Sequence, residues 1–224
     1  MVSSWEILNP PPNGSAIAQG LDFIPPQWDL TPVCGKCPAQ PHWASEPPVP
    51  RETIKTGIKE RLYTGYGLKL GDSSDGLLAL NVNSKAGHRI LLAMAQGDLP
   101  DTVSFSSGKP HCFQLLFAVP DEHRNALQHI SRKRLTQCGN VAAPATCKGE
   151  PAGWLGVRYN RCQSVVPASW HPETGDYQWR RSPQDAAVAI APAWLLDWLL
   201  ELSLEAQLKT EFGGNEYDPK NPTK

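Results

Sequence analysis

The sequence contains no long apolar run, no marked excess of charge of either sign, and few cysteines. No stretch approaches the roughly 20 consecutive apolar residues that a membrane-spanning helix needs, so we expect no membrane partner. The first residues lack the basic start and the apolar core of a secretory signal, which predicts a cytoplasmic protein. The net charge of −1 argues against a protein that coats nucleic acid by bulk electrostatics, but it is compatible with a local basic site.

The six cysteines are too sparse in a chain of 224 residues for a disulfide scaffold. Cys34 and Cys37 form a single CxxC motif. A zinc site normally adds a second such pair or two histidines, and a redox dithiol normally precedes a helix; the sequence has neither pattern here. We therefore interpret the motif as a turn between Pro32 and Pro38, with zinc and redox roles as the open alternatives.

The composition, with 40% hydrophobic and 19% charged residues, is typical of a globular protein. We divide it into a proline-rich N-terminal segment (1–27), a main domain (28–205) and a polar tail or linker (206–224). Periodicity and turn residues predict helices at about 51–63, 85–96 and 121–137 and from Pro192 onward, and strands at about 28–33, 77–82, 103–105, 113–119, 155–157, 163–166 and 177–179. Strands and helices mix without strict alternation, which predicts an α+β fold.

Basic residues cluster in two regions of the predicted domain. Arg132-Lys133-Arg134 would lie near the end of the 121–137 helix, where positive charge complements the helix dipole. Arg158, Arg161 and the pair Arg180-Arg181 follow short strands, where they are either exposed hairpin charges or part of a groove for a nucleic-acid template.

The apolar run 77–82 leads into the most informative residues, Asn81 and Asn83. Side chains alternate between the two faces of a strand, so these amides are expected on one face at the strand end. Two acids in this arrangement commonly hold a divalent metal. Here both acids are amides, and the alternative explanation is that the asparagines simply end a strand.

Several short motifs occur along the chain in a fixed order. They are Leu30-Thr31-Pro32-Val33 with Gly35-Lys36, Leu70-Gly71 before an apolar strand, Ser107-Gly108 before the next, the run from Val165 to Pro172 with Tyr177-Gln178-Trp179, and the run from Pro192 to Leu196. In this order, over about residues 28–202, they resemble the N-terminal domain of bifunctional DNA primase-polymerases. That family is a branch of the archaeo-eukaryotic primase superfamily, found in plasmid and phage replication proteins.

The resemblance implies a primase-polymerase-type mixed sheet flanked by helices. It implies nucleotidyl transfer in replication, with a DNA template and nucleoside triphosphates as partners, and with a helicase or another replication protein as a candidate further partner. It also implies Mg²⁺ or Mn²⁺ as cofactor, held by three carboxylates, and a histidine near the Ser-Gly loop that holds the nucleotide phosphates.

The family's three acid positions do not carry acids in this chain. The first motif, acid-Val-acid, falls on Asn81-Val82-Asn83, and the third acid, just before Val157-Arg158, falls on Gly156. Residues 151–172 contain no Asp or Glu that a shifted alignment could recruit. Because Mg²⁺ is held largely through ligand charge, we expect metal binding to be weak or lost and catalysis to be impaired.

The second motif, Ser-Gly-x-x-His in the family, matches Ser107, Gly108 and His111, with Lys109 as a phosphate contact. Counting back from Phe117 instead assigns the histidine position to Gln114; we prefer His111. Arg158 is a further candidate phosphate contact and Arg161 a candidate nucleic-acid contact. His171 is assigned a structural role.

Three interpretations of function therefore remain. The first is a primase-polymerase domain with impaired catalysis. The second is a non-catalytic module that binds nucleic acid or nucleotide on the same fold. The third is a structural domain centred on the CxxC motif, with no role in nucleic-acid binding.

Overall fold

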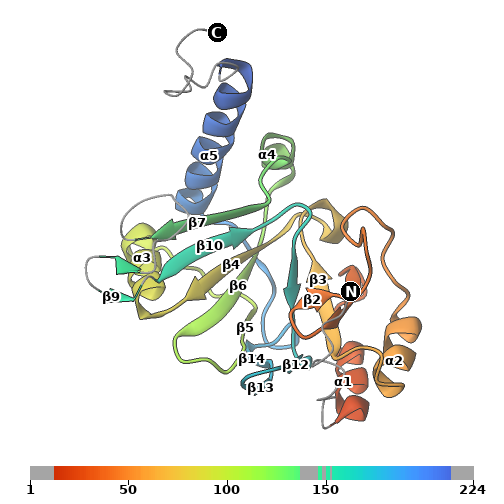
Figure 1. The fold of residues 1–224 in the computed structure, drawn as a ribbon. Helices are drawn as coiled ribbons and strands as arrows, with labels where there is room; N and C mark the ends of the chain where they lie inside the picture. Colours follow the sequence, from red (N-terminus) through yellow and green to blue (C-terminus); the bar gives the residue numbers. More distant parts are fainter. Residues whose placement is uncertain (1–12, 137–145, 148–149, 152, 213–224) are drawn as a thin grey trace, which may run out of the picture.

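The computed structural model describes residues 13–136, 146–147, 150–151 and 153–212. It has the α+β architecture that the sequence predicts (Figure 1). The α-helices are α1 (Gly14–Gly20), α2 (Arg51–Lys59), α3 (Lys85–Ala95), α4 (Asp121–Leu127) and α5 (Ala193–Phe212), with short 3-10 helices η1 (Leu21–Phe23) and η2 (Asp72–Ser74). None of the helices in this described part has the length and apolar character that crossing a bilayer requires.

A seven-stranded sheet forms the centre of the molecule. Its strands, in spatial order, are β14 (Gln178–Arg181), β5 (Ser104–Ser106), β6 (Cys112–Ala118), β4 (Leu77–Asn83), β10 (Trp154–Arg158) and β7 (Arg132–Thr136), and β15 (Ala189–Ile190) pairs in parallel with β6. Helices α3 and α5 supply Leu91, Leu195 and Leu199 to a core that contains Leu80 and Val82 of β4. One face of this sheet is therefore covered by helices.

A smaller sheet packs against part of the opposite face. It contains β11 (Gln163–Val165), β3 (Gly65–Lys69), β1 (Leu30–Cys34) and β2 (Cys37–Pro38), in that order. Ile54 of α2 and Tyr66 of β3 share a second core with Ala79, Phe105 and Leu116 of the large sheet. In Figure 1 the smaller sheet lies between the large sheet and helices α1 and α2. Two hairpins complete the fold, β12 (Trp170–His171) with β13 (Gly175–Asp176) and β8 (Thr146–Cys147) with β9 (Glu150–Pro151).

The predicted helix at 121–137 is wrong beyond its first two turns. Helix α4 ends at Leu127, and Arg132–Thr136 forms strand β7 at the edge of the large sheet. Arg132 and Arg134 alternate with Lys133 and Leu135, which suits a strand, and β7 gains a backbone partner in β10 that the local sequence does not reveal. The basic cluster is therefore on a strand and does not complement a helix dipole.

Sequence reasoning missed several elements, among them α1 and β3. The short helix α1 begins after Asn13, whose side chain accepts a hydrogen bond from the amide of Ala16 at 3.1 Å. Strand β3 is buried on both faces, so it shows no polar alternation. Helix α5 continues to Phe212, so residues 206–212 of the predicted tail or linker are helical; residues 213–224 lie outside the described part. Residues 172–174 join β12 to β13, two strands that were not predicted.

Candidate functional site

The strand register brings the predicted site residues onto one face of the large sheet. Asn81 of β4 pairs with Gln114 of β6 on one side and with Gly156 of β10 on the other. Directly paired residues of antiparallel strands share a face, and so do residues two apart. The same face therefore carries Asn81, Asn83, Cys112, Gln114, Gly156, Arg158, Arg132 and Arg134.

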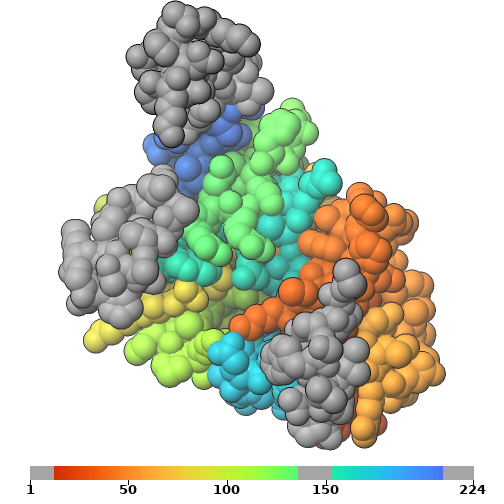
Figure 2. Space-filling model, in the orientation of Figure 1, coloured from red at the N-terminus to blue at the C-terminus, as the bar shows by residue number. Residues whose placement is uncertain are grey.

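A polar pocket of about 150 Å³ opens where this face meets the loops of the smaller sheet. It brings together several predicted residues from distant parts of the chain. Its lining includes Asn81, Asn83, Ser107, Lys109 and Arg158, and it also includes Lys36, Cys112, Phe113, Gln114, His171 and Tyr177. Figure 2 shows the outer surface of this region, where the N-terminal part in orange meets the light-blue segment around β12 and β13.

The Gln114 amide has a fixed orientation at the back of the pocket. Ser164 of β11 donates a hydrogen bond from its Oγ to Gln114 Oε1 at 2.7 Å. With the oxygen satisfied in this way, the Gln114 Nε2 group is the part of the amide available to donate to a ligand. A neutral amide cannot accept or release a proton at ordinary pH, so Gln114 can hold a phosphate oxygen but cannot supply charge.

Arg158 supplies positive charge at the wall of the pocket. Its Nη1 donates to the carbonyl oxygen of Gln163 at 3.3 Å and to Ser164 Oγ at 3.4 Å. Burial, with a further contribution from the neighbouring Arg132 guanidinium, lowers the pKa of Arg158. Because an arginine keeps its charge even when the pKa falls, the half-buried guanidinium is a fixed cation that favours an anionic partner.

Gly156, at the third acid position, has no room for a side chain. A Cβ added there would lie 2.6 Å from Trp154 Cζ3 and 2.9 Å from Trp154 Cε3. Arg134 packs over the same indole, with its Cζ atom 4.6 Å from the ring centroid. The space that an acidic side chain at 156 would enter is therefore filled by Trp154.

Three of the predicted site residues, Gly108, His111 and Arg161, do not line the pocket. His111 is exposed in the turn before β6 and has a φ of 58°. The pocket lining includes Gln114, the alternative histidine position, and does not include His111. Arg161 is exposed in the turn between β10 and β11. Of the two other candidates after short strands, Arg180 lies 4.2 Å from the Phe113 ring centroid and Arg181 forms an ion pair with Asp101 at 2.7 Å.

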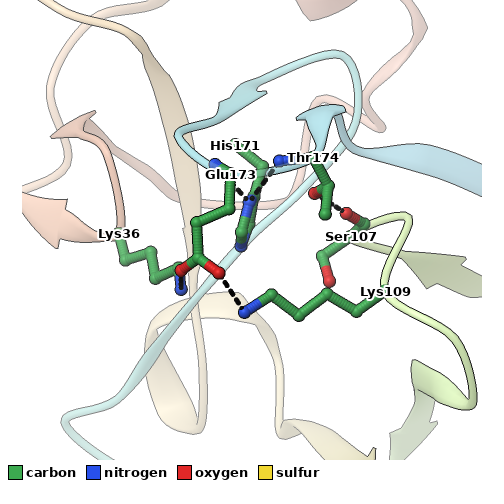
Figure 3. Close-up of polar contacts among 6 residues, drawn as sticks. All are labelled: Lys36, Ser107, Lys109, His171, Glu173 and Thr174. Atoms are coloured by element: carbon green, nitrogen blue, oxygen red, sulfur yellow. Dashed lines mark hydrogen bonds and ion pairs between the residues drawn. The ribbon is translucent and has the colours of Figure 1, made fainter.

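Lys36 and Lys109 meet at the mouth of the pocket, where both bind Glu173 (Figure 3). Lys36 lies in the two-residue turn between β1 and β2, where Gln163 Nε2 donates to its carbonyl oxygen at 2.9 Å. Lys109 lies in the loop between β5 and β6. Hydrogen bonds from Lys109 and then Lys36 lower the pKa of Glu173 to about 2, so the carboxylate is ionised at neutral pH.

His171 contributes to the pocket although its sequence position indicated only a structural role. Its Nδ1 accepts hydrogen bonds from the amides of Glu173 at 3.2 Å and Thr174 at 3.3 Å. Burial, with the nearby charges of Lys36 and Lys109, lowers the pKa of His171. The ring is therefore neutral, and its Nε2–H group is the remaining donor.

The divalent metal expected from the resemblance does not fit these residues. The acid positions offer two neutral amides and a glycine, while Lys36, Lys109 and Arg158 line the same pocket. At an effective dielectric constant of ~20, one carboxylate about 4 Å from a divalent ion attracts it by roughly 8 kcal/mol, so the loss of all three carboxylates removes the attraction that would hold the ion. Within the described ranges no three His, Cys, Asp or Glu side chains are grouped as a metal site requires.

The CxxC motif forms the turn that the sequence predicts. Cys34 and Cys37 are paired across the β1–β2 hairpin, and the Cys34 Sγ donates to the carbonyl oxygen of Leu62 at 3.4 Å. The turn between them carries Lys36 to the pocket mouth. The motif therefore contributes to the site through the position of this lysine.

Sequence reasoning missed Lys36, His171 and Tyr177 as parts of the pocket. All three residues did belong to the ordered motifs, but nothing local in the sequence shows that the β1–β2 turn and the β12–β13 hairpin meet. The turn and the hairpin meet because the two sheets pack against each other in the folded chain.

Comparison with known proteins identifies the family of the chain. No curated protein matches the chain. The family model for the N-terminal domain of bifunctional DNA primase/polymerases, however, matches residues 20–194, which is most of the chain and includes every residue of the pocket. The chain therefore belongs to the bifunctional DNA primase/polymerase family and carries its N-terminal domain.

Proposed function

We propose that this domain binds the phosphates of nucleotides or of single-stranded template DNA through its own cations, without a divalent metal and without nucleotidyl transfer. In this proposal Lys36, Lys109 and Arg158 provide the positive charge that metal ions provide in a catalytic site. The Gln114 amide and the neutral His171 ring donate hydrogen bonds to phosphate oxygens.

The observation that carries the proposal is the charge of the pocket. Its lining contains Lys36, Lys109 and Arg158, and none of its described lining residues is acidic. Catalysis by two metal ions needs acidic ligands to hold them. Phosphate binding needs only donors and positive charge, which this pocket supplies.

Arg161 has a distinct role in the proposal. The turn that carries Arg161 lies next to β10 but outside the pocket lining. Arg161 would therefore contact a DNA strand that extends beyond the pocket. The family membership supports a role in DNA replication, and in this proposal the domain recruits template or nucleotide.

Primer extension on a primed DNA template, with Mg²⁺ or Mn²⁺ and all four deoxynucleotides, tests the absence of catalysis. We expect no template-dependent extension. Anisotropy of a labelled single-stranded oligonucleotide in chelator tests the binding; we expect a signal that falls steeply with added salt, because the contacts are phosphate contacts. Efficient extension, or binding unaffected by salt and by the combined Lys109→Ala, Arg158→Ala and Arg161→Ala substitutions, would refute the proposal.

A further inference from the structure

The contact between Glu173 and the two lysines of the pocket has the geometry of a bound anion. Glu173 Oε1 lies 3.2 Å from Lys36 Nζ, and Glu173 Oε2 lies 2.5 Å from Lys109 Nζ. Each carboxylate oxygen therefore takes one ammonium group, as two non-bridging oxygens of one phosphate group would. Figure 3 shows the two lysines reaching this carboxylate from opposite sides, with the His171 ring beside it.

The hairpin that carries Glu173 is held against the pocket by separate contacts. Thr174 donates from Oγ1 to the carbonyl oxygen of Ser107, which joins the hairpin to the β5–β6 loop. His171 Nδ1 accepts from the amides of Glu173 and Thr174 and so fixes the turn. These bonds use backbone groups and the Thr174 hydroxyl, so the hairpin keeps its place when the Glu173 carboxylate leaves the lysines.

The Glu173 side chain itself is free to turn outward. It is 58% exposed. Among the described residues, the two lysines are the only charged groups that form an ion pair with it. Exposed ion pairs of this kind contribute little to folding stability. The carboxylate can therefore be displaced by a stronger anion without disturbing the core.

We propose that Glu173 is an intramolecular competitor of the ligand, whose carboxylate occupies the position that one phosphate group of a polyphosphate ligand takes between Lys36 and Lys109. This inference rests on the proposed function, since it assigns the phosphate group at the pocket mouth. In the free protein Glu173 forms ion pairs with both lysines, and an incoming polyphosphate displaces it. Glu173 therefore weakens ligand binding, and its removal strengthens it.

Titration calorimetry with inorganic tripolyphosphate in chelator tests this directly. Glu173→Gln keeps the side-chain size and removes the charge, and we expect affinity to rise about fivefold, because the ligand no longer breaks two exposed ion pairs. Glu122→Gln is the matched control: it removes the same charge from an exposed position in the first turn of α4, and we expect no change. Adding Lys36→Ala to the Glu173→Gln variant should abolish the gain.

Three results would overturn the inference, and they differ in what they say of the proposed function. If Glu173→Gln binds more weakly than the unchanged protein, the carboxylate positions the lysines and does not compete. If the two bind equally while Lys109→Ala weakens binding, the competition is absent but phosphate binding stands. If neither the unchanged protein nor Glu173→Gln binds tripolyphosphate, the proposed function fails together with the inference.

Discussion

The crowding around Gly156 predicts how much a methyl group added at this position would destabilise the fold. An alanine methyl group there would lie 2.6 Å and 2.9 Å from two Trp154 ring carbons and 3.2 Å from the Lys133 carbonyl oxygen. Carbon atoms in contact are normally about 3.5–4.0 Å apart, so the ring must move. Overpacking of this kind costs about 1–3 kcal/mol.

An opposing effect has to be subtracted from that cost. Gly156 is in a regular strand without a positive φ, so alanine also reduces the conformational freedom of the unfolded chain. That effect stabilises a protein by about 0.4–1 kcal/mol. We therefore expect Gly156→Ala to lower the free energy of unfolding by roughly 1–2 kcal/mol.

Trp154→Ala removes the obstacle and should reverse the sign of the effect. In that background Gly156→Ala is expected to raise the free energy of unfolding by about 0.5 kcal/mol. Urea denaturation of the four proteins, with the m-value checked for constancy, measures the coupling energy of the cycle. An identical effect of Gly156→Ala in both backgrounds would show that Trp154 does not fill this space, and would refute the account of the third acid position.

Two further predictions follow from the charges around the pocket. In the folded state the pKa of His171 lies below its ordinary value of 6.5. Once the pH falls through 6.5, the unfolded state binds more protons than the folded state, so the stability that is present above this pH is lost below it. The free energy of unfolding from urea titrations should therefore decrease between about pH 7 and about pH 5, and decrease less in His171→Gln; parallel curves would contradict this. For Arg161, which lies outside the pocket, we expect Arg161→Ala to weaken single-stranded DNA binding in anisotropy titrations and to reduce the salt slope by about one, while tripolyphosphate affinity in calorimetry stays unchanged. A loss of tripolyphosphate affinity would place Arg161 in the pocket instead.

The sequence predicted the elements whose pattern is local. The apolar run that became β4, the run that became β6 and the apolar residues at helical spacing near the start of α5 each identify an element without knowledge of its neighbours. The face shared by Asn81 and Asn83 follows from the twofold period of a strand alone.

The parts that failed depend on partners distant in the chain. Arg132 and Arg134 resemble a helix end until β10 supplies their backbone partner, and β3 shows no alternation because both of its faces are buried. Which of His111 and Gln114 lines the pocket depends on strand register, because Gln114 pairs with Asn81 inside β6 while His111 lies in the turn before it. Lys36 reaches the pocket only because two sheets and a hairpin converge there.

The central claim is that fixed cations of the chain, and not a metal, hold the phosphates of the ligand. Calorimetric titration with deoxyadenosine triphosphate, once in chelator and once with excess Mg²⁺, tests it most directly. The account predicts binding in chelator at least as tight as with Mg²⁺, because Mg²⁺ neutralises the triphosphate charge that Lys36, Lys109 and Arg158 attract. Binding that appears only when Mg²⁺ is added, or no binding in either buffer, would contradict it.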